Sequence, residues 1–353
     1  MNAPVTLEQL QHPGQQGLTL RLRTLTPLYT GGIGQFGDQL HPSNLLGGLR
    51  HMSALVARTL GVADFESRVW GVTGQAKQLA LHWDTRKLQS IPLPGKIDLP
   101  QRADGRQSRW WFNTAHDGEL GLTLTRRGIS DEDWQILLIA LAIQIRHGSF
   151  GAKDQFGLGV LELMDGRPFV APLDVDVKRD KALLNEAQGK LNLLRYCFIK
   201  VRFRRAPGAQ AQPNLNRSTA LTLGLATRAT LRNALRAEDN APAAEKDRLT
   251  RLRHRMLGKL NEYGSAVNVS AAYGDQNAPE LRISIALKSA GRDAETDKAE
   301  RTETMKRLVN SLPQIDEMIA TTGYRYDSNE REFGGARAKD KAAWLNTLAG
   351  VTP

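Results

Sequence analysis

The chain has 353 residues, which is enough for two ordinary domains, each with its own hydrophobic core. Its 48 Lys and Arg residues against 37 Asp and Glu residues give a net charge of +11, which suits a polyanionic partner. One cysteine excludes an internal disulfide, and the longest apolar run, residues 136–145, is too short to span a bilayer, so we expect a soluble, cytoplasmic protein that binds no membrane.

The first half of the chain shows strand and helix patterns in the order β-α-β-β-α-β. The expected strands are residues 17–26, 79–83, 110–112 with 120–125, and 160–164, and the expected helices are residues 43–60 and 131–147. We expect residues 65–74 to be irregular and residues 85–108, which contain three prolines, to form a long excursion. This order is typical of the ferredoxin-like fold, an antiparallel sheet with two helices on one face.

The second half predicts a more helical α+β domain. The expected strands are residues 196–204, 266–272 and 281–288, and the expected helices are residues 221–235, 245–260, 302–320 and 342–348, with a loop at 324–335. Cys197 lies between Tyr196 and Phe198, which indicates a buried strand thiol rather than a nucleophile. We therefore divide the chain into a domain at residues 17–165, a connector at 166–190 and a second domain at 191–353.

Two glycine-rich loops lie at the ends of expected strands. The first, with Gly31, Gly32 and Gly34, opens onto the start of a helix, where backbone N–H groups and the helix dipole favour an anion. The second, GSFGAKDQFGLG at residues 148–159, precedes the fourth strand. We expect the two loops to approach one face of the domain, where Arg50 and Lys153 would meet phosphates.

These loops carry a resemblance to a known family. TPLYTGG at residues 26–32 and HPSNLLGGLR at 41–50 resemble the "TPLxTGG … RPxSxxGxLR" opening of CRISPR RAMP proteins, most like the first subunit of the type III-B Cmr effector complex. The second loop resembles the family's "GxxGAR…GxG" motif with Lys153 in place of the usual Arg, and Glu66 and the Trp70-Gly71 pair fall where the family has Glu and Phe-Gly. His51-Met52 departs from the aromatic pair usual after the helix arginine.

The resemblance implies a RAMP/RRM-type ferredoxin-like domain followed by a second RAMP-like domain. It implies a noncatalytic RNA-binding subunit of an antiviral, RNA-guided complex, with crRNA (its 3′ region), target RNA and other Cmr or RAMP subunits as partners. Because the sequence shows no metal-ligand spacing, nucleophile elbow or P-loop, we expect no cofactor or metal. Two alternatives stay open. One is a RAMP-type endoribonuclease that uses Asp38 for metal-dependent cleavage, and the other is a structural adaptor without RNA contact.

The candidate RNA-binding residues belong to five features: the two glycine loops, the helix that follows the first loop, an aromatic run and a basic helix. Trp111 is a candidate for stacking on an unpaired base, and RLRHRMLGK at residues 251–259 places basic side chains at helical spacing. The full set is Gly31, Gly32, Gly34, Arg50, His51, Trp111, Gly151, Lys153, Gly157, Arg251, Arg255 and Lys259. No catalytic residue is assigned outside the Asp38 alternative.

Overall fold

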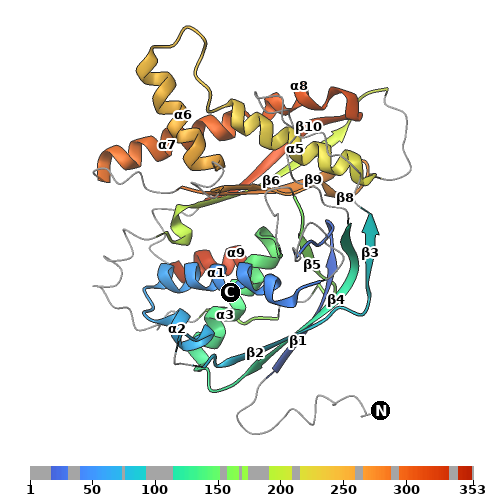
Figure 1. The fold of residues 1–353 in the computed structure, drawn as a ribbon, viewed down its shortest axis with the longest axis vertical. Helices are drawn as coiled ribbons and strands as arrows, with labels where there is room; N and C mark the ends of the chain where they lie inside the picture. Colours follow the sequence, from blue (N-terminus) through green and yellow to red (C-terminus); the bar gives the residue numbers. More distant parts are fainter. Residues whose placement is uncertain are drawn as a thin grey trace. The chain divides into compact units, whose positions relative to one another are not determined.

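The structure is a computed structural model that describes residues 17–30, 40–73, 76–92, 114–151, 157–166, 169–173, 191–208, 215–258, 265–287, 294–333 and 341–351. The chain forms two compact units (Figure 1). The first comprises Met1–Ala152, Gly159–Asn192 and Arg337–Pro353, and the second comprises Lys153–Leu158 and Leu193–Ala336. Both units are mixed α+β structures built on an antiparallel sheet.

The first unit holds one sheet in the order β2-β4-β1-β5, with β3 paired to β4. Its elements are β1 (Gly17–Thr24), α1 (Pro42–Leu60), α2 (Phe65–Trp70), β2 (Leu79–Asp84), β3 (Leu88–Pro92), β4 (Thr114–Arg126), α3 (Asp131–His147), β5 (Leu161–Leu163) and α9 (Lys341–Ala349). Figure 1 shows α1, α3 and α9 on one side of this sheet.

Helix α3 lies at the centre of the first core. Its N-cap Ser130 accepts a hydrogen bond from the Asp133 backbone N–H, and residues 136–145 are all buried. A helix that is apolar all round must be covered on every side, and both α1 and α9 pack on α3. Helix α9 therefore completes the core of the first unit, whereas the sequence assigns residues 342–348 to the second domain.

The second unit holds one sheet in the order β10-β6-β9-β7, with β8 paired to β9. Its elements are β6 (Tyr196–Arg205), α5 (Arg217–Asn233), α6 (Ala243–Leu257), β7 (Val267–Val269), β8 (Tyr273–Gly274), β9 (Pro279–Ala286), α7 (Ala294–Asn310), α8 (Ile315–Ile319) and β10 (Tyr324–Phe333). Alternate residues of β6 are buried, among them Cys197, Ile199 and Val201, as a strand with one face on the core requires.

Several sequence predictions of local structure are wrong. Residues 65–70 form helix α2, whose buried Phe65 and Val69 give too short a periodic signal to detect. Strand β3 lies inside the segment that we expected to be an excursion, and the helix expected over residues 302–320 is interrupted between α7 and α8 near Pro313. The strand expected at residues 110–112 lies outside the described residues.

The largest correction is strand β10, which occupies most of the expected loop at residues 324–335. Its sequence, YRYDSNEREF, lacks an apolar alternation because charged residues fill both of its faces. The strand forms because it pairs along its length with β6, where Glu330 meets Arg202 at 2.7 Å and Asp327 meets Arg204 at 3.8 Å. No helix in the described part of the chain is long and apolar enough to cross a membrane.

Candidate nucleic-acid interface

The two ends of the first glycine loop are held together by Thr30. Its hydroxyl accepts a hydrogen bond from the His41 backbone N–H at 2.8 Å, and its carbonyl accepts one from the Asn44 side-chain amide. These bonds bring the segment that follows β1 next to the N-terminus of α1. Pro42 is the first residue of that helix, a position that proline favours. The candidates Gly31, Gly32 and Gly34, and Asp38 of the alternative, lie outside the described residues.

The base of the second glycine loop lies beside the start of the first. Phe150 donates its backbone N–H to the carbonyl of Gly159 at 2.7 Å, which closes the loop at its base. Gly159 in turn donates its N–H to the carbonyl of Pro27 at 2.9 Å, three residues before Thr30. The bases of the two loops are therefore adjacent in the first unit.

Two glycines of the second loop are required by close approach of the chain to itself. Gly151 has φ +87°, and a Cβ atom there would overlap the carbonyl oxygen of Tyr29. Gly157 belongs to the second unit, where its carbonyl accepts a hydrogen bond from Ala271 N at 3.1 Å and a Cβ would overlap that nitrogen. These two candidates thus make room for protein backbone, and Lys153 lies outside the described residues.

Arg50 lies on α1 beside a shared carboxylate. Its Nε is 3.7 Å from Oε1 of Glu66, and its side chain is 49% exposed. The other carboxylate oxygen of Glu66 accepts a hydrogen bond at 3.2 Å from Arg58, which also donates to the Leu191 carbonyl. One acidic group therefore serves two arginines, and the looser contact leaves Arg50 accessible to a second anion.

The sequence did not identify Arg58 as the competitor for Glu66. The signal that could have found it is the spacing of Arg50 and Arg58, which lie eight residues, a little over two turns, apart on one predicted helix and can both reach a carboxylate between them. His51, the next candidate along α1, is exposed.

Helix α6 carries the candidates Arg251 and Arg255 in different surroundings. Arg251 lies 3.4 Å from Asp247, and both side chains are about 70% exposed, at 72% and 70%. Arg255 is 25% exposed and donates at 2.9 Å to Glu300 of α7, whose side chain is only 9% exposed. Lys259 and Trp111 lie outside the described residues.

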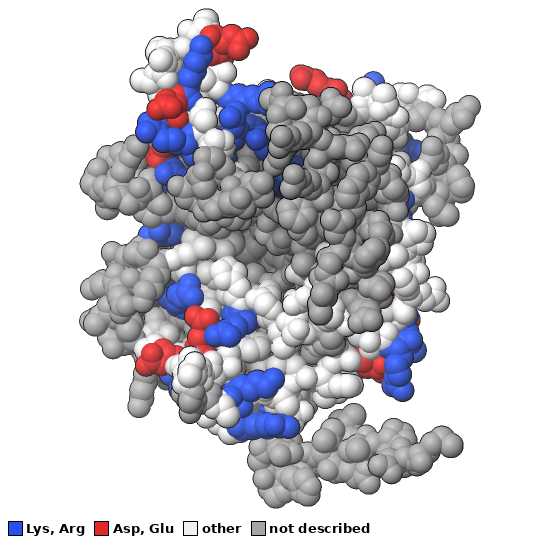
Figure 2. All heavy atoms as spheres, viewed as in Figure 1, with Lys and Arg blue, Asp and Glu red and all other residues white. Residues whose placement is uncertain are grey.

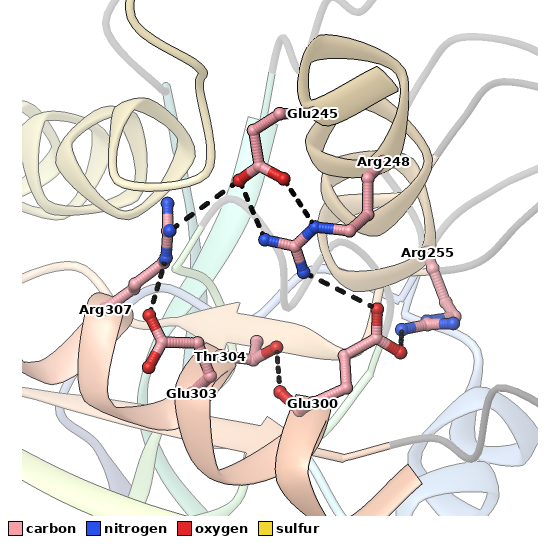
Figure 3. A network of polar contacts seen from close by, with 7 residues as sticks. All are labelled: Glu245, Arg248, Arg255, Glu300, Glu303, Thr304 and Arg307. Carbon is pink, nitrogen blue, oxygen red and sulfur yellow. Dashed lines mark hydrogen bonds and ion pairs between the residues drawn. The ribbon is translucent and has the colours of Figure 1, made fainter. Parts of the chain in front are cut away.

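Arg255 belongs to an ion-pair network between α6 and α7 (Figure 3). Glu245 accepts two hydrogen bonds from Arg248 and also lies 3.8 Å from Arg307 of α7, which pairs with Glu303. The hydrogen bonds from Arg248 hold the pKa of Glu245 below its ordinary value. Because acids and bases alternate across the two helices, this network holds α6 against α7 and offers little net charge to a ligand.

Metal binding finds no support in the described part of the chain, where no three His, Cys, Asp or Glu residues are arranged to hold an ion. Cys197 is fully buried in β6, as the sequence predicted, and burial raises the pKa of its thiol to about 12. The described residues of the candidate site are loop bases and basic side chains, and an accessible guanidinium such as that of Arg50 can pair with an anion.

Neither a protein-family model nor a curated protein matches this sequence. Among solved structures, the apo crystal structure of Cmr1 from Pyrococcus furiosus is similar at 12% identity and a TM-score of 0.45, over 90% of this chain and 99% of that chain. A chain from a cryo-EM structure of the type III-B Cmr-beta complex bound to cognate target RNA is similar at 10% identity and a TM-score of 0.47, over 83% of this chain and 99% of that chain. Cmr6 from Pyrococcus furiosus reaches a TM-score of 0.27 at 12% identity, over 43% of this chain and 98% of that chain.

These structures come from the Cmr systems whose first subunit the sequence motifs resemble. Every TM-score lies below 0.5 and no identity exceeds 12%. The likenesses by themselves therefore assign no ligand, activity or site residue to this chain.

Proposed function

We propose that this chain is a noncatalytic RNA-binding subunit of a type III-B CRISPR effector complex. In this role it contacts guide or target RNA through the phosphate backbone, and base pairing between the two RNAs supplies the sequence specificity. The other subunits of such a ribonucleoprotein are its protein partners.

The observation that carries the proposal is the adjacency of the two glycine-loop bases. The motifs TPLYTGG and GSFGAKDQFGLG are far apart in the sequence, and the hydrogen bond from Gly159 N to Pro27 O brings their ends together. Both motifs resemble the same family, and their ends lie next to each other in the fold. This favours one shared binding site over two unrelated loops. Half-exposed Arg50 follows the first loop on α1 and supplies a guanidinium for a phosphate.

The strand order of the two sheets supports tandem ferredoxin-like folds. With the added strand β3 set aside, the first sheet places its strands in the chain order second, third, first, fourth. With β8 set aside, the second sheet has the same order read from its other edge. We infer that each unit is a RAMP-type domain of β-α-β-β-α-β topology.

The proposal is tested by crosslinking RNA to this chain in the assembled complex. We expect ultraviolet irradiation followed by mass spectrometry to find nucleotides attached to peptides covering residues 26–50 and 148–159. Crosslinks to every other subunit but none to this chain would contradict the proposal and favour a structural adaptor.

The noncatalytic part of the proposal needs a separate experiment. The assembled complex carrying Asp38→Ala is incubated with RNA complementary to the guide, with the unaltered complex as control. We expect the same cut positions and rates from both. Loss of cuts in the variant would instead favour a metal-dependent endoribonuclease.

A further inference from the structure

The second unit brings three arginines together at the place where α5 ends beside α6. Arg228 of α5 fixes this contact, because its Nη2 donates to the Leu257 carbonyl at the end of α6 at 3.1 Å. Arg232 lies one turn further along α5 than Arg228, and Arg253 lies one turn before Leu257 on α6, so each lies next to this contact on its own helix. Arg236 lies three residues beyond the end of α5, and the positive charges of Arg232 and Arg236 both act on Arg253.

The charge of this arginine cluster, Arg232, Arg236 and Arg253, is not neutralised within the described part of the chain. Arg232 and Arg236 are exposed, and the structure gives none of the three a carboxylate within 4.0 Å. Nε of Arg253 is buried without a hydrogen-bond partner. Burial lowers the pKa of Arg253, and the positive charges of Arg232 and Arg236 lower it further. The protonated guanidinium of Arg253 is therefore less favourable in the fold than in water.

The other arginines of α6 provide a contrast on the same helix. Arg248, Arg251 and Arg255 each have a carboxylate partner at 2.7, 3.4 and 2.9 Å respectively. These three arginines are therefore each balanced by a carboxylate, whereas Arg232, Arg236 and Arg253 have none within 4.0 Å among the described residues. Figure 2 shows Lys and Arg side chains gathered over the part of the second unit where α5 and α6 lie.

Like charges held together without a counter-ion destabilise a fold unless an anion binds between them. Three guanidinium groups on two helices present several N–H donors in fixed planes, which suits the oxygens of a phosphate better than a point charge would. The acidic residues nearest in sequence, Glu238 and Asp239 in the turn after α5, make no ion pair with the cluster in the structure.

We infer that Arg232, Arg236 and Arg253 form a phosphate-binding site that takes the phosphodiester backbone of single-stranded RNA. The inference rests on the proposed function and adds to it a contact at α5 and α6 of the second unit, distinct from the two glycine loops. A flexible single strand can place successive phosphates against exposed Arg232 and Arg236 while a deeper oxygen meets Nε of Arg253.

The test is a salt titration of the binding of a fluorescent single-stranded RNA to the full-length chain, followed by anisotropy. The test variant is Arg232→Gln/Arg253→Gln. The matched control is Lys298→Ala/Lys306→Ala, which removes two exposed charges from α7 away from the cluster. We expect the test variant to bind at least about tenfold more weakly and the slope of log K against log salt to fall by about 1.4, the loss of two single-strand phosphate contacts.

Folding of the variant is checked by thermal melting. Because the substitutions remove mutual repulsion, we expect a melting temperature no lower than that of the unaltered chain. If the double variant melts early, Arg232→Gln alone replaces it, since Arg232 is exposed and its side chain has no ion pair with any described residue.

The outcomes separate this inference from the proposed function. Equal affinity and slope for the test variant and the unaltered chain would overturn the arginine cluster as an RNA site while RNA binding itself stands. An equal loss in the test and control variants would also overturn it, since it would show dependence on net charge alone. Failure of the unaltered chain to bind RNA would overturn the proposed function and, with it, the RNA ligand of this site.

Discussion

Gly151 passes so close to the backbone carbonyl of Tyr29 that even a methyl group on its Cα would overlap that oxygen. Tyr29 directly precedes Thr30, which closes the first glycine loop, and Gly151 lies at the base of the second. The contact therefore ties the geometry of one loop to the geometry of the other. Any ligand that spans both loops depends on this junction.

Gly151→Ala is expected to destabilise the first unit by about 3 kcal/mol. About 1–2 kcal/mol comes from a left-handed backbone that L-residues avoid, and the rest comes from displacement of the Tyr29 carbonyl. Gly128→Ala is a matched control, because Gly128 has the same φ of +87° and no atom within 4 Å of the added Cβ. Urea unfolding of both variants measures the difference, and equal losses would show that the Tyr29 contact contributes nothing.

The sequence predicts the parts of the fold that have a local periodic signal. The apolar spacing of α1, the capped start of α3 and the alternation of β6 all correspond to observed elements. We also expected the two glycine loops to approach one face of the domain, and the hydrogen bond between Gly159 and Pro27 brings their bases together.

The remaining features depend on partners that are distant in the sequence. Strand β10 has no apolar pattern of its own and forms against the charged face of β6. Arg251 and Arg255 look equivalent in the helical pattern of the sequence. Arg255 contributes to the contact between α6 and α7 because Glu300 of α7 lies beside it. Sequence spacing alone cannot tell whether a glycine leaves room for RNA or for the chain's own backbone. Gly151 and Gly157 leave room for the backbone.

Cys197 is expected to react with thiol reagents only when the chain unfolds. Its side chain is fully buried in β6, and burial raises the pKa of the thiol to about 12, so the nucleophilic thiolate is scarce at neutral pH. With a disulfide reagent at pH 8, we expect the native chain to react at least about a hundred times more slowly than the chain in urea. Rapid labelling of the folded chain would contradict the burial of this strand.

The Cys197 thiol should also make the free energy of unfolding depend on pH. The folded-state pKa lies above the unfolded value of about 8.5, so above that pH the folded state holds a proton that the unfolded state has lost. Stability therefore falls as the pH rises, by up to about 1.4 kcal/mol per pH unit, and the effect extends toward pH 12. Urea unfolding between pH 8.5 and 10 measures this slope, and Cys197→Ala should flatten it.

Arg255→Ala is expected to lower the free energy of unfolding of the second unit by about 2 kcal/mol. The substitution removes the nearest cation from Glu300, whose side chain is 9% exposed, and leaves it Arg248 at 4.0 Å among the described residues. Arg251→Ala on the same helix removes an exposed pair with Asp247 and should change stability by less than about 0.5 kcal/mol. Urea unfolding distinguishes them, and similar small losses from both would show that the network in Figure 3 does not stabilise the packing of α6 on α7.

Glu66→Gln is expected to strengthen RNA binding, and Arg50→Ala to weaken it. Glu66 neutralises part of the charge of Arg50 across 3.7 Å, so its loss leaves the guanidinium to a phosphate, while Arg58 keeps its bond to Leu191. In a salt titration, Arg50→Ala should lower the slope of log K against log salt by about 0.7, and Arg50→Ala with Lys153→Ala by about 1.4. Exposed Lys77→Ala serves as the control for net charge in the same unit. Identical titrations for Glu66→Gln, Arg50→Ala and the unaltered chain would remove the start of α1 from the RNA interface.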